Sequence, residues 1–251
     1  DLVCFWSFGD DYPYRAPENL PGMFKLSGEA LGPVVGHVYR APGHYRLRVD
    51  IYGTVAGKLI HGFSEAEITV KDPDAIFDGN RTLFVSPSSD WSHAPEGALQ
   101  YTSLDRACDN ANTSRRGGLY RIMLNRGEVY DFGGIRFGFN TQRAPTLHIV
   151  AGAGEGANPV INCTGGFSAL ANYDEDYRNK DLVFQNLTLM GALDSTAGDY
   201  PANFPDAVTC MEISPQLLLL DGCEISGFAL GLYRHDADRT GHRGAYVNDC
   251  V

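Results

Sequence analysis

The sequence lacks two features that would point to a membrane or to nucleic acid. It has no run of about 18 apolar residues, the length that a membrane-spanning helix needs. It also has few basic residues, with 20 Lys and Arg against 31 Asp and Glu and a formal net charge of -11. Nucleic acids and anionic membranes attract clustered positive charge. We therefore predict no membrane span and no binding to nucleic acid.

Metal-binding cysteine motifs are absent as well. The six cysteines include no Cys-x-x-Cys pair, which argues against a zinc site, and their even number permits disulfides without requiring them. An acidic segment at 173–177 could attract Ca²⁺, but it lacks the glycine and the spaced ligands of known calcium loops. We therefore predict no cofactor, with Ca²⁺ as an option that no motif supports.

Many turns separate short apolar segments in this chain. Of 251 residues, 29 are Gly and 13 are Pro, and 43% are hydrophobic, which is enough to fill one large core or two ordinary ones. Short apolar runs separated by Gly, Asn and Asp are typical of strands joined by turns. The composition predicts an all-β protein.

Residues 1–73 carry the alternation expected of a β-sandwich. After a Pro-Gly turn at 42–43, Tyr45, Leu47 and Val49 alternate with polar neighbours along a strand that is apolar on one face. An aromatic strand at 4–8 and a partner strand at 67–70 would supply the other layers. The pattern predicts an Ig-like β-sandwich over 1–73.

Two motifs in this part of the chain resemble the signature of PKD domains. Residues 6–10 read Trp-Ser-Phe-Gly-Asp, and residues 37–47 read His-Val-Tyr-Arg-Ala-Pro-Gly-His-Tyr-Arg-Leu. The resemblance implies a spacer or adhesion module of an extracellular protein, with no chemistry of its own. A cation site built from Asp10, Asp11 and His37 would lack a coordination sphere. We therefore expect Asp10 to form a turn and His37 to be packed and hydrogen-bonded.

The apolar segments of the second half repeat. Residues 182–191 align with 218–227 at a shift of 36 (223 minus 187) and then with 246–251 at a shift of 27 (250 minus 223). Strands at 120–124 and 147–150 extend the series to roughly five or six coils, each of which buries its apolar side chains against the next. The alignment predicts one inward column of Leu187, Cys223 and Cys250, with the cysteines as reduced thiols in preference to a disulfide.

One helix is predicted ahead of these strands. Leu104, Ala107, Cys108 and Ala111 recur at helical spacing behind a Thr or Ser cap at 102–103. The predicted helix covers residues 102–111.

From about residue 80 onward the chain resembles the right-handed parallel β-helix of the pectin-lyase-like superfamily. The resemblance rests on residues 84–87, the predicted helix, residues 122–130, and residues 149–152 ahead of 159–161. It implies that 80–251 forms such a β-helix, incomplete at its C-terminal end, with the helix capping the N-terminal coil. Some members bind or cleave polysaccharides and others are inert fibres or adhesins, so the fold alone leaves activity open.

Two segments between the predicted strands are rich in polar and aromatic residues. Residues 194–206 could line a sugar-binding rim, and residues 233–243, with two His, two Asp and three Arg, could hold a polyanion or a metal. The alternative for each is a solvated loop between coils. The candidate carbohydrate-binding residues are Asp194, Asp199, Tyr200, Asp206, Tyr233, Arg234, His235, Asp236, Asp238, Arg239, His242 and Arg243.

The sequence as a whole predicts an extracellular or cell-surface protein that interacts with polysaccharide through the β-helix, with the PKD-like module as spacer or adhesion unit. Two alternatives stay open. One is a non-catalytic fibre or adhesin component, and the other is a polysaccharide lyase or glycoside hydrolase, for which we match no catalytic motif. We also expect the chain to belong to a longer polypeptide or to self-associate through its module ends, because bare strand edges invite pairing.

Overall fold

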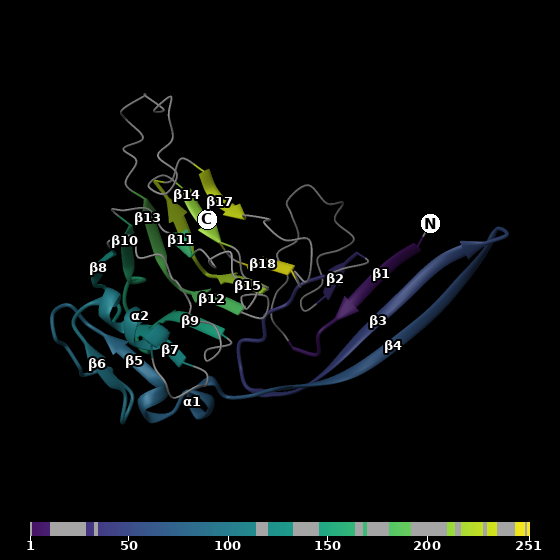
Figure 1. Ribbon diagram of the computed structural model, residues 1–251. Helices are drawn as coiled ribbons and strands as arrows, with labels where there is room; N and C mark the ends of the chain where they lie inside the picture. Colours follow the sequence, from purple (N-terminus) through teal and green to yellow (C-terminus); the bar gives the residue numbers. More distant parts are fainter. Residues whose placement is uncertain are drawn as a thin grey trace, which may run out of the picture. The chain divides into compact units, whose positions relative to one another are not determined.

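The computed structural model describes residues 2–10, 29–32, 35–113, 120–132, 146–163, 168–169, 181–191, 210–213, 217–227, 230–234, 244–248 and 250–251. The chain divides into two compact units, Asp1–Ile76 and Phe77–Val251 (Figure 1). The described residues are mostly β, as the composition predicts. Within the described residues, no helix is long and apolar enough to cross a membrane.

The N-terminal unit contains a four-stranded antiparallel sheet. Its strands are β1 (Leu2–Ser7), β2 (Glu29–Leu31), β3 (Gly43–Val55) and β4 (Lys58–Val70), in the order β2-β1-β3-β4. The partner strand that the sequence predicts at 67–70 is the end of the much longer β4. The second layer of the predicted sandwich is not among the residues that the structure describes.

Strands β3 and β4 form one long hairpin. Ala56 and Gly57 make a two-residue turn with φ of 50° and 77°, which is the geometry of a type I′ turn. From there the register runs without a shift from the Val55–Lys58 pair to the Gly43–Val70 pair. The alternation that predicts β3 holds in its first half, where Tyr45 and Leu47 are half-buried and Arg46 is exposed.

The motif residues of this unit pack on one another. The His37 ring stacks on Phe8 with ring centroids 4.0 Å apart, and its Nε2 lies 2.8 Å from Asp10 Oδ2. Tyr39 stands edge-on to His37 and donates its hydroxyl hydrogen bond to the Phe8 carbonyl. Between Phe8 and Asp10, Gly9 passes so close to the β3 backbone that a Cβ would lie 2.8 Å from the Arg46 carbonyl oxygen. The packed, hydrogen-bonded role predicted for His37 is confirmed, and the turn role of Asp10 stays a prediction.

The described part of the second unit forms three sheets in which every strand pairing is parallel. The seven-stranded sheet is built from β5 (Thr82–Val85), β6 (Leu99–Tyr101), β7 (Tyr120–Leu124), β9 (Thr146–Ala151), β12 (Asp181–Gln185), β15 (Leu217–Asp221) and β18 (Gly244–Asn248). The four-stranded sheet contains β8 (Val129–Phe132), β10 (Val160–Cys163), β13 (Thr188–Gly191) and β16 (Glu224–Ser226). The three-stranded sheet contains β11 (Ser168–Ala169), β14 (Cys210–Ile213) and β17 (Leu230–Arg234).

Successive strands along the chain visit the three sheets in turn. The chain passes through β9, β10 and β11, then through β12, β13 and β14, and then through β15, β16 and β17, so we call each set a three-strand repeat. Leu182 pairs with Leu218, and Leu219 pairs with Tyr246. These pairings have the predicted shifts of 36 (218 minus 182) and 27 (246 minus 219), so the alignment of the repeated segments is confirmed.

The predicted inward column is also present. Leu187 and Cys223 are buried in the main core, and Cys250 packs against it half-buried. The Leu187 carbonyl accepts a hydrogen bond from the Glu224 N–H, and the Cys223 carbonyl accepts one from Val251, which continues the parallel pairing from repeat to repeat. Cys223 and Cys250 are free thiols, and burial raises the pKa of Cys223 to about 12.

A helix covers the first strands of this unit. Helix α2 (Leu104–Thr113) begins two residues later than predicted, and its Arg106 N–H approaches the Ser103 hydroxyl at 3.4 Å. All four predicted apolar positions are buried in the same core as β5 and β7: Leu104, Ala107, Cys108 and Ala111. The predicted helix is therefore confirmed. Two short helical turns, α1 (Pro73–Ile76) and η1 (Gly79–Arg81), were not predicted.

We predict that Gly227→Ala destabilises the protein more than Gly127→Ala. Both glycines have positive φ, 72° and 74°, so both substitutions carry the backbone cost of about 1–2 kcal/mol. A Cβ at residue 227 would also lie 2.6 Å from the Gly191 carbonyl oxygen in the neighbouring repeat, whereas one at residue 127 meets nothing within 4 Å. Urea unfolding of the two variants checks this, and equal midpoints would contradict close stacking at this corner.

Candidate functional site

The two segments predicted to contact a ligand lie almost wholly outside the described residues. The structure gives no description of Asp194, Asp199, Tyr200, Asp206, His235, Asp236, Asp238, Arg239, His242 or Arg243. Tyr233 and Arg234 are the last two residues of β17, where their backbones pair with Glu212 and Ile213 of β14. The acidic segment at 173–177 also lies outside the description.

The attachment points of these segments are nevertheless defined. Residues 192–209 leave β13 of the four-stranded sheet and lead into the first residue of β14, whereas residues 235–243 follow the last residue of β17. Because β14 and β17 are parallel neighbours, one segment attaches where the strands of the three-stranded sheet begin and the other attaches where they end. Residues 170–180 follow β11, so the acidic segment and the arginine-rich segment both attach to the C-terminal ends of the parallel strands.

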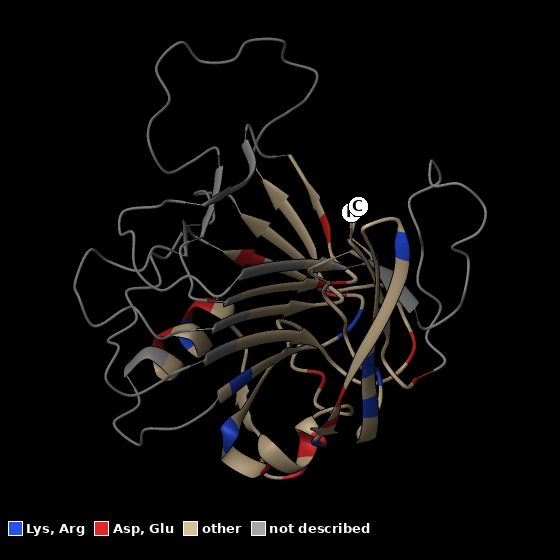
Figure 2. Ribbon diagram, turned by 90° about the vertical axis from the view of Figure 1, so that its right-hand side faces the viewer, with Lys and Arg blue, Asp and Glu red and all other residues tan. Residues whose placement is uncertain are grey.

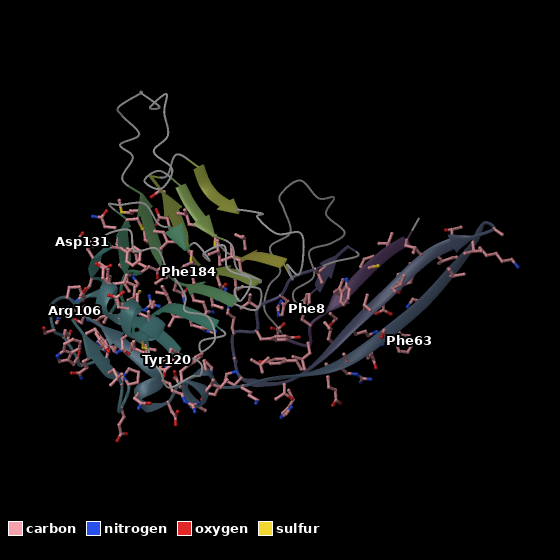
Figure 3. All side chains as sticks on the ribbon, viewed as in Figure 1. Phe8, Phe63, Arg106, Tyr120, Asp131 and Phe184 are labelled. Atoms are coloured by element: carbon pink, nitrogen blue, oxygen red, sulfur yellow. The ribbon has the colours of Figure 1, made fainter. Side chains whose placement is uncertain are left out.

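The four-stranded sheet presents a row of side chains that face outward. Asp131 pairs in register with Asn162, and Asn162 pairs with Met190 on the next strand. Asp131 and Met190 are exposed, and the Asn162 amide donates a hydrogen bond to Asp131 at 3.1 Å. The neighbouring residues that alternate with this row, among them Tyr130, Ile161 and Leu189, are buried. Figure 3 shows Asp131 at the surface of the unit and Phe184 in its interior.

Charge on this outward face is acidic. The sequences of β8, β10, β13 and β16 contain Asp131 and Glu224 but no Lys or Arg. Described basic residues lie on other elements of both units, such as Arg46 on β3, Arg106 on α2 and Arg121 on β7, and Figure 2 colours Lys and Arg blue. The face formed by the four strands therefore offers hydrogen-bonding groups without a positive charge for an anionic ligand.

A polar cluster around Glu128 joins the first strands of the parallel unit. Glu128 Oε1 accepts hydrogen bonds from the Ser86 hydroxyl at 2.9 Å, from the Asn125 amide at 3.1 Å, and from the Ser88 hydroxyl. The Tyr130 hydroxyl lies 2.9 Å from the Asn125 carbonyl, 3.0 Å from the Val85 carbonyl and 3.4 Å from Glu128 Oε2.

These contacts tie together residues that follow β5, residues that follow β7 and the start of β8. Burial and the neighbouring Glu128 carboxylate raise the pKa of Tyr130, so the phenol stays a hydrogen-bond donor. Because Glu128 is occupied by four donors from its own chain, it is better suited to holding the corner than to acting as a catalytic acid. The only sequence signal for this cluster is weak, and it is the Asn-Arg-Gly-Glu turn at 125–128.

A second buried cluster lies beside the first strands of the seven-stranded sheet. The Arg121 guanidinium is buried, donates to the Thr82 hydroxyl at 3.0 Å and lies over the Phe77 ring at 5.4 Å from its centroid. The His148 ring contacts the same phenylalanine, with centroids 4.8 Å apart. Burial, with a contribution from the nearby Arg121 charge, lowers the pKa of His148 to about 4. His148 is therefore neutral at physiological pH.

The N-terminal hairpin carries an ion-pair network on one face. Arg48 donates two hydrogen bonds to Asp50, at 2.7 and 2.8 Å, and His61 Nε2 lies 2.7 Å from the same carboxylate. Hydrogen bonds from Arg48 and His61 lower the pKa of Asp50 to about 2. Tyr52 stacks on His61, and Arg48 lies over Phe63, so the faces of these rings are already partly covered by their neighbours.

Comparisons add no relative to this picture. No protein family, curated protein or solved structure matches the chain. Among the described residues, no three His, Cys, Asp or Glu side chains are grouped so that they could hold a metal ion.

The low pKa of His148 predicts a pH-dependent stability. Between pH 6.5, the ordinary value, and about pH 4, the unfolded chain binds a proton at this residue and the folded chain does not. Stability should therefore fall as pH falls through this window, by up to roughly 3 kcal/mol. His148→Gln should flatten that part of the curve, while the exposed His93→Gln should not. Chemical denaturation at a series of pH values checks this, and parallel curves for wild type and His148→Gln would contradict it.

Proposed function

We propose that this chain is an extracellular or cell-surface protein that binds polysaccharide through its second unit. In this proposal the second unit is a right-handed parallel β-helix, and the N-terminal unit is a PKD-like spacer or adhesion module. The row of outward-facing side chains on the four-stranded sheet, centred on Asp131 and Asn162, carries the proposal.

The pairing of successive three-strand repeats supports the β-helix interpretation. A chain whose strands enter three parallel sheets in a fixed order must wind around one core, and the core residues come from all of the repeats. Helix α2 packs on the first strands of that core, which is the position that the resemblance implies for a capping helix. Handedness is part of the proposal and rests on the resemblance.

The outward row is suited to a linear polymer. Parallel strands lie about 4.8 Å apart, a spacing comparable to the length of one pyranose unit, so equivalent side chains on neighbouring strands can meet successive sugars. Asp131 and Asn162 supply carboxylate and amide groups of the kind that bind sugar hydroxyls. Residues 192–209, which include the acids and Tyr200 of the first predicted segment, follow β13 directly in the chain.

Charge favours a neutral glycan on this face. The four strands carry two acids and no base, and the net charge of -11 opposes long-range attraction of a polyanion. An anionic glycan would need the arginines at 234–243, which attach to a different sheet. The proposal therefore assigns neutral polysaccharide to the four-stranded sheet and reserves anionic polysaccharide for the arginine-rich segment.

Packing of the N-terminal motif supports a spacer role. Phe8, His37 and Tyr39 are occupied with one another and with Asp10, so the most distinctive residues of this unit maintain its structure. Catalysis would need a pair of carboxylates or an acid-held cation facing the sugar. Incubation with polysaccharides, followed by assays for new reducing ends and unsaturated products, separates a binding protein from a hydrolase or lyase. A protein that neither binds nor cleaves any glycan would favour the structural alternative, a fibre or adhesin component.

We predict that Asp131→Ala/Asn162→Ala weakens binding to neutral polysaccharide by roughly tenfold or more, because each substitution removes hydrogen bonds worth about 1 kcal/mol. Glu96→Ala/Gln100→Ala is the matched control, since it removes one exposed acid and one exposed amide elsewhere in the same unit. Isothermal titration calorimetry with defined oligosaccharides measures the difference. Equal affinities for the two variants would contradict the assignment to this face.

The arginine-rich segment generates a separate prediction. If it binds an anionic glycan, Arg234→Ala/Arg239→Ala/Arg243→Ala should weaken that binding by roughly tenfold at low salt and by less at high salt, where charges are screened. Substituting Lys71, Arg81 and Arg106 by Ala gives the same change of net charge as a control. Unchanged affinity for the first variant would return the segment to the solvated-loop interpretation.

A further inference from the structure

Strand β4 is an unusually long exposed edge. It is the outer strand of its sheet, with β3 on one side and no described strand on the other. It runs for 13 residues, and every residue from Lys58 to Ala66 is exposed. The outer strands of the other described sheet edges have two to five residues. A strand of this kind offers a continuous row of backbone N–H and C=O groups to another strand.

Among the described residues, most of the usual protection of such an edge is missing. Proteins block edge strands with proline, with bulges, with charges that point inward or with short length. β4 has no proline and no register shift against β3, and its single lysine, Lys58, stands beside the turn. Its exposed apolar side chains include Leu59 at 74% and Phe63 at 60% relative exposure (Figure 3 labels Phe63). These properties are those of a surface that is covered by a partner.

Hairpin geometry defines which backbone groups are available. In a two-residue hairpin the residues that flank the turn, here Val55 and Lys58, exchange backbone hydrogen bonds. The even-numbered residues of β4 therefore direct their N–H and C=O groups toward β3, and the odd-numbered residues from Leu59 to Thr69 direct theirs outward. A partner strand must pair with the odd-numbered residues.

We propose that β4 pairs antiparallel with β4 of a second copy of this chain, about a two-fold axis at Ser64. In this register the numbers of two paired residues add up to 128. His61 then lies opposite Glu67, Ile60 lies opposite Ile68, and Phe63 lies opposite Glu65. The two four-stranded sheets become one continuous sheet of two copies.

Charge and length select this register. With the axis at Ser64, all 13 residues of β4 are paired, and no two charges of the same sign are directly opposite. An axis at Glu65 would set Glu65 against itself, and an axis at Ala66 would set Glu65 against Glu67, which is unfavourable. An axis at Phe63 would leave the Thr69 end of the strand facing the turn. Arg46 and Arg48 of the same copy already pair with Glu65, which keeps its charge from opposing association.

A cysteine at the proposed axis gives a register-specific test. Residues at position 64 of the two copies would form a non-hydrogen-bonded pair with Cα atoms about 4.5 Å apart, which is within the range of a disulfide. Ser64→Cys should therefore yield a disulfide-linked dimer under mild oxidation. In the control Ala66→Cys, the new cysteines would be about 13 Å apart along the strands, and no such dimer should form.

A charge-swap experiment tests the interface without a covalent bond. Residues 59 and 69 face each other across the two copies but lie at opposite ends of one strand within a copy. Leu59→Lys/Thr69→Lys should weaken dimerisation relative to Leu59→Lys/Thr69→Glu by roughly tenfold in dissociation constant, measured by analytical ultracentrifugation.

Three outcomes would overturn the proposal. The first is wild-type protein that stays monomeric at the highest soluble concentration, which would leave the edge to a different chain. The second is a dimer with the same dissociation constant in both charge variants. The third is equal cross-linking of Ser64→Cys and Ala66→Cys.

Discussion

Parallel, in-register pairing between successive three-strand repeats is the constraint on which the second unit depends. A single repeat contributes one strand to each of three sheets and has no partner within itself for the backbone groups of those strands. Its apolar side chains are likewise buried only against the repeats on either side, as the column of Leu187, Cys223 and Cys250 shows. Pairing and burial therefore arise together. The outward row at Asp131 and Asn162 is a by-product of the same register, since alternate residues must face away from the core.

The N-terminal unit solves the same problem in another way. Its hairpin pairs residues that are close in sequence, and the aromatic cluster of Phe8, His37 and Tyr39 holds the segment after β1 against the segment before β3. That arrangement satisfies the backbone groups on one side of β4 and leaves those on the other side without a described partner strand.

The parallel unit has its most extensive polar cluster around Glu128, where side chains from three places in the chain contact one carboxylate.

The sequence predicted the elements whose signal is periodic. The shifts of 36 and 27 residues, the helix at Leu104 to Ala111 and the burial of Leu187 and Cys223 all follow from apolar spacing, and the structure confirms them. The length of β4 was missed because Gly62, Ser64 and Glu65 interrupt the alternation, and long-range pairing with β3 imposes the strand there. The Glu128 cluster was missed because the contacts of Glu128 with Ser86 and Ser88 join residues 42 and 40 positions apart, which no local pattern records. The predicted ligand residues, apart from Tyr233 and Arg234, fall outside the described chain, so their placement stays a prediction.

The separation of paired strands along the sequence has a consequence for the order of folding. The β3–β4 hairpin closes a loop of two residues, whereas the pairings between repeats bring together residues 20 to 44 positions apart. Closing the longer loops costs more chain entropy, so local contacts form faster than the parallel ones. We expect the hairpin to form early during synthesis, when β4 has no second copy at hand, and the parallel unit to grow one repeat at a time. The strands that precede the repeats, covered by helix α2, would then serve as the template on which each repeat is added.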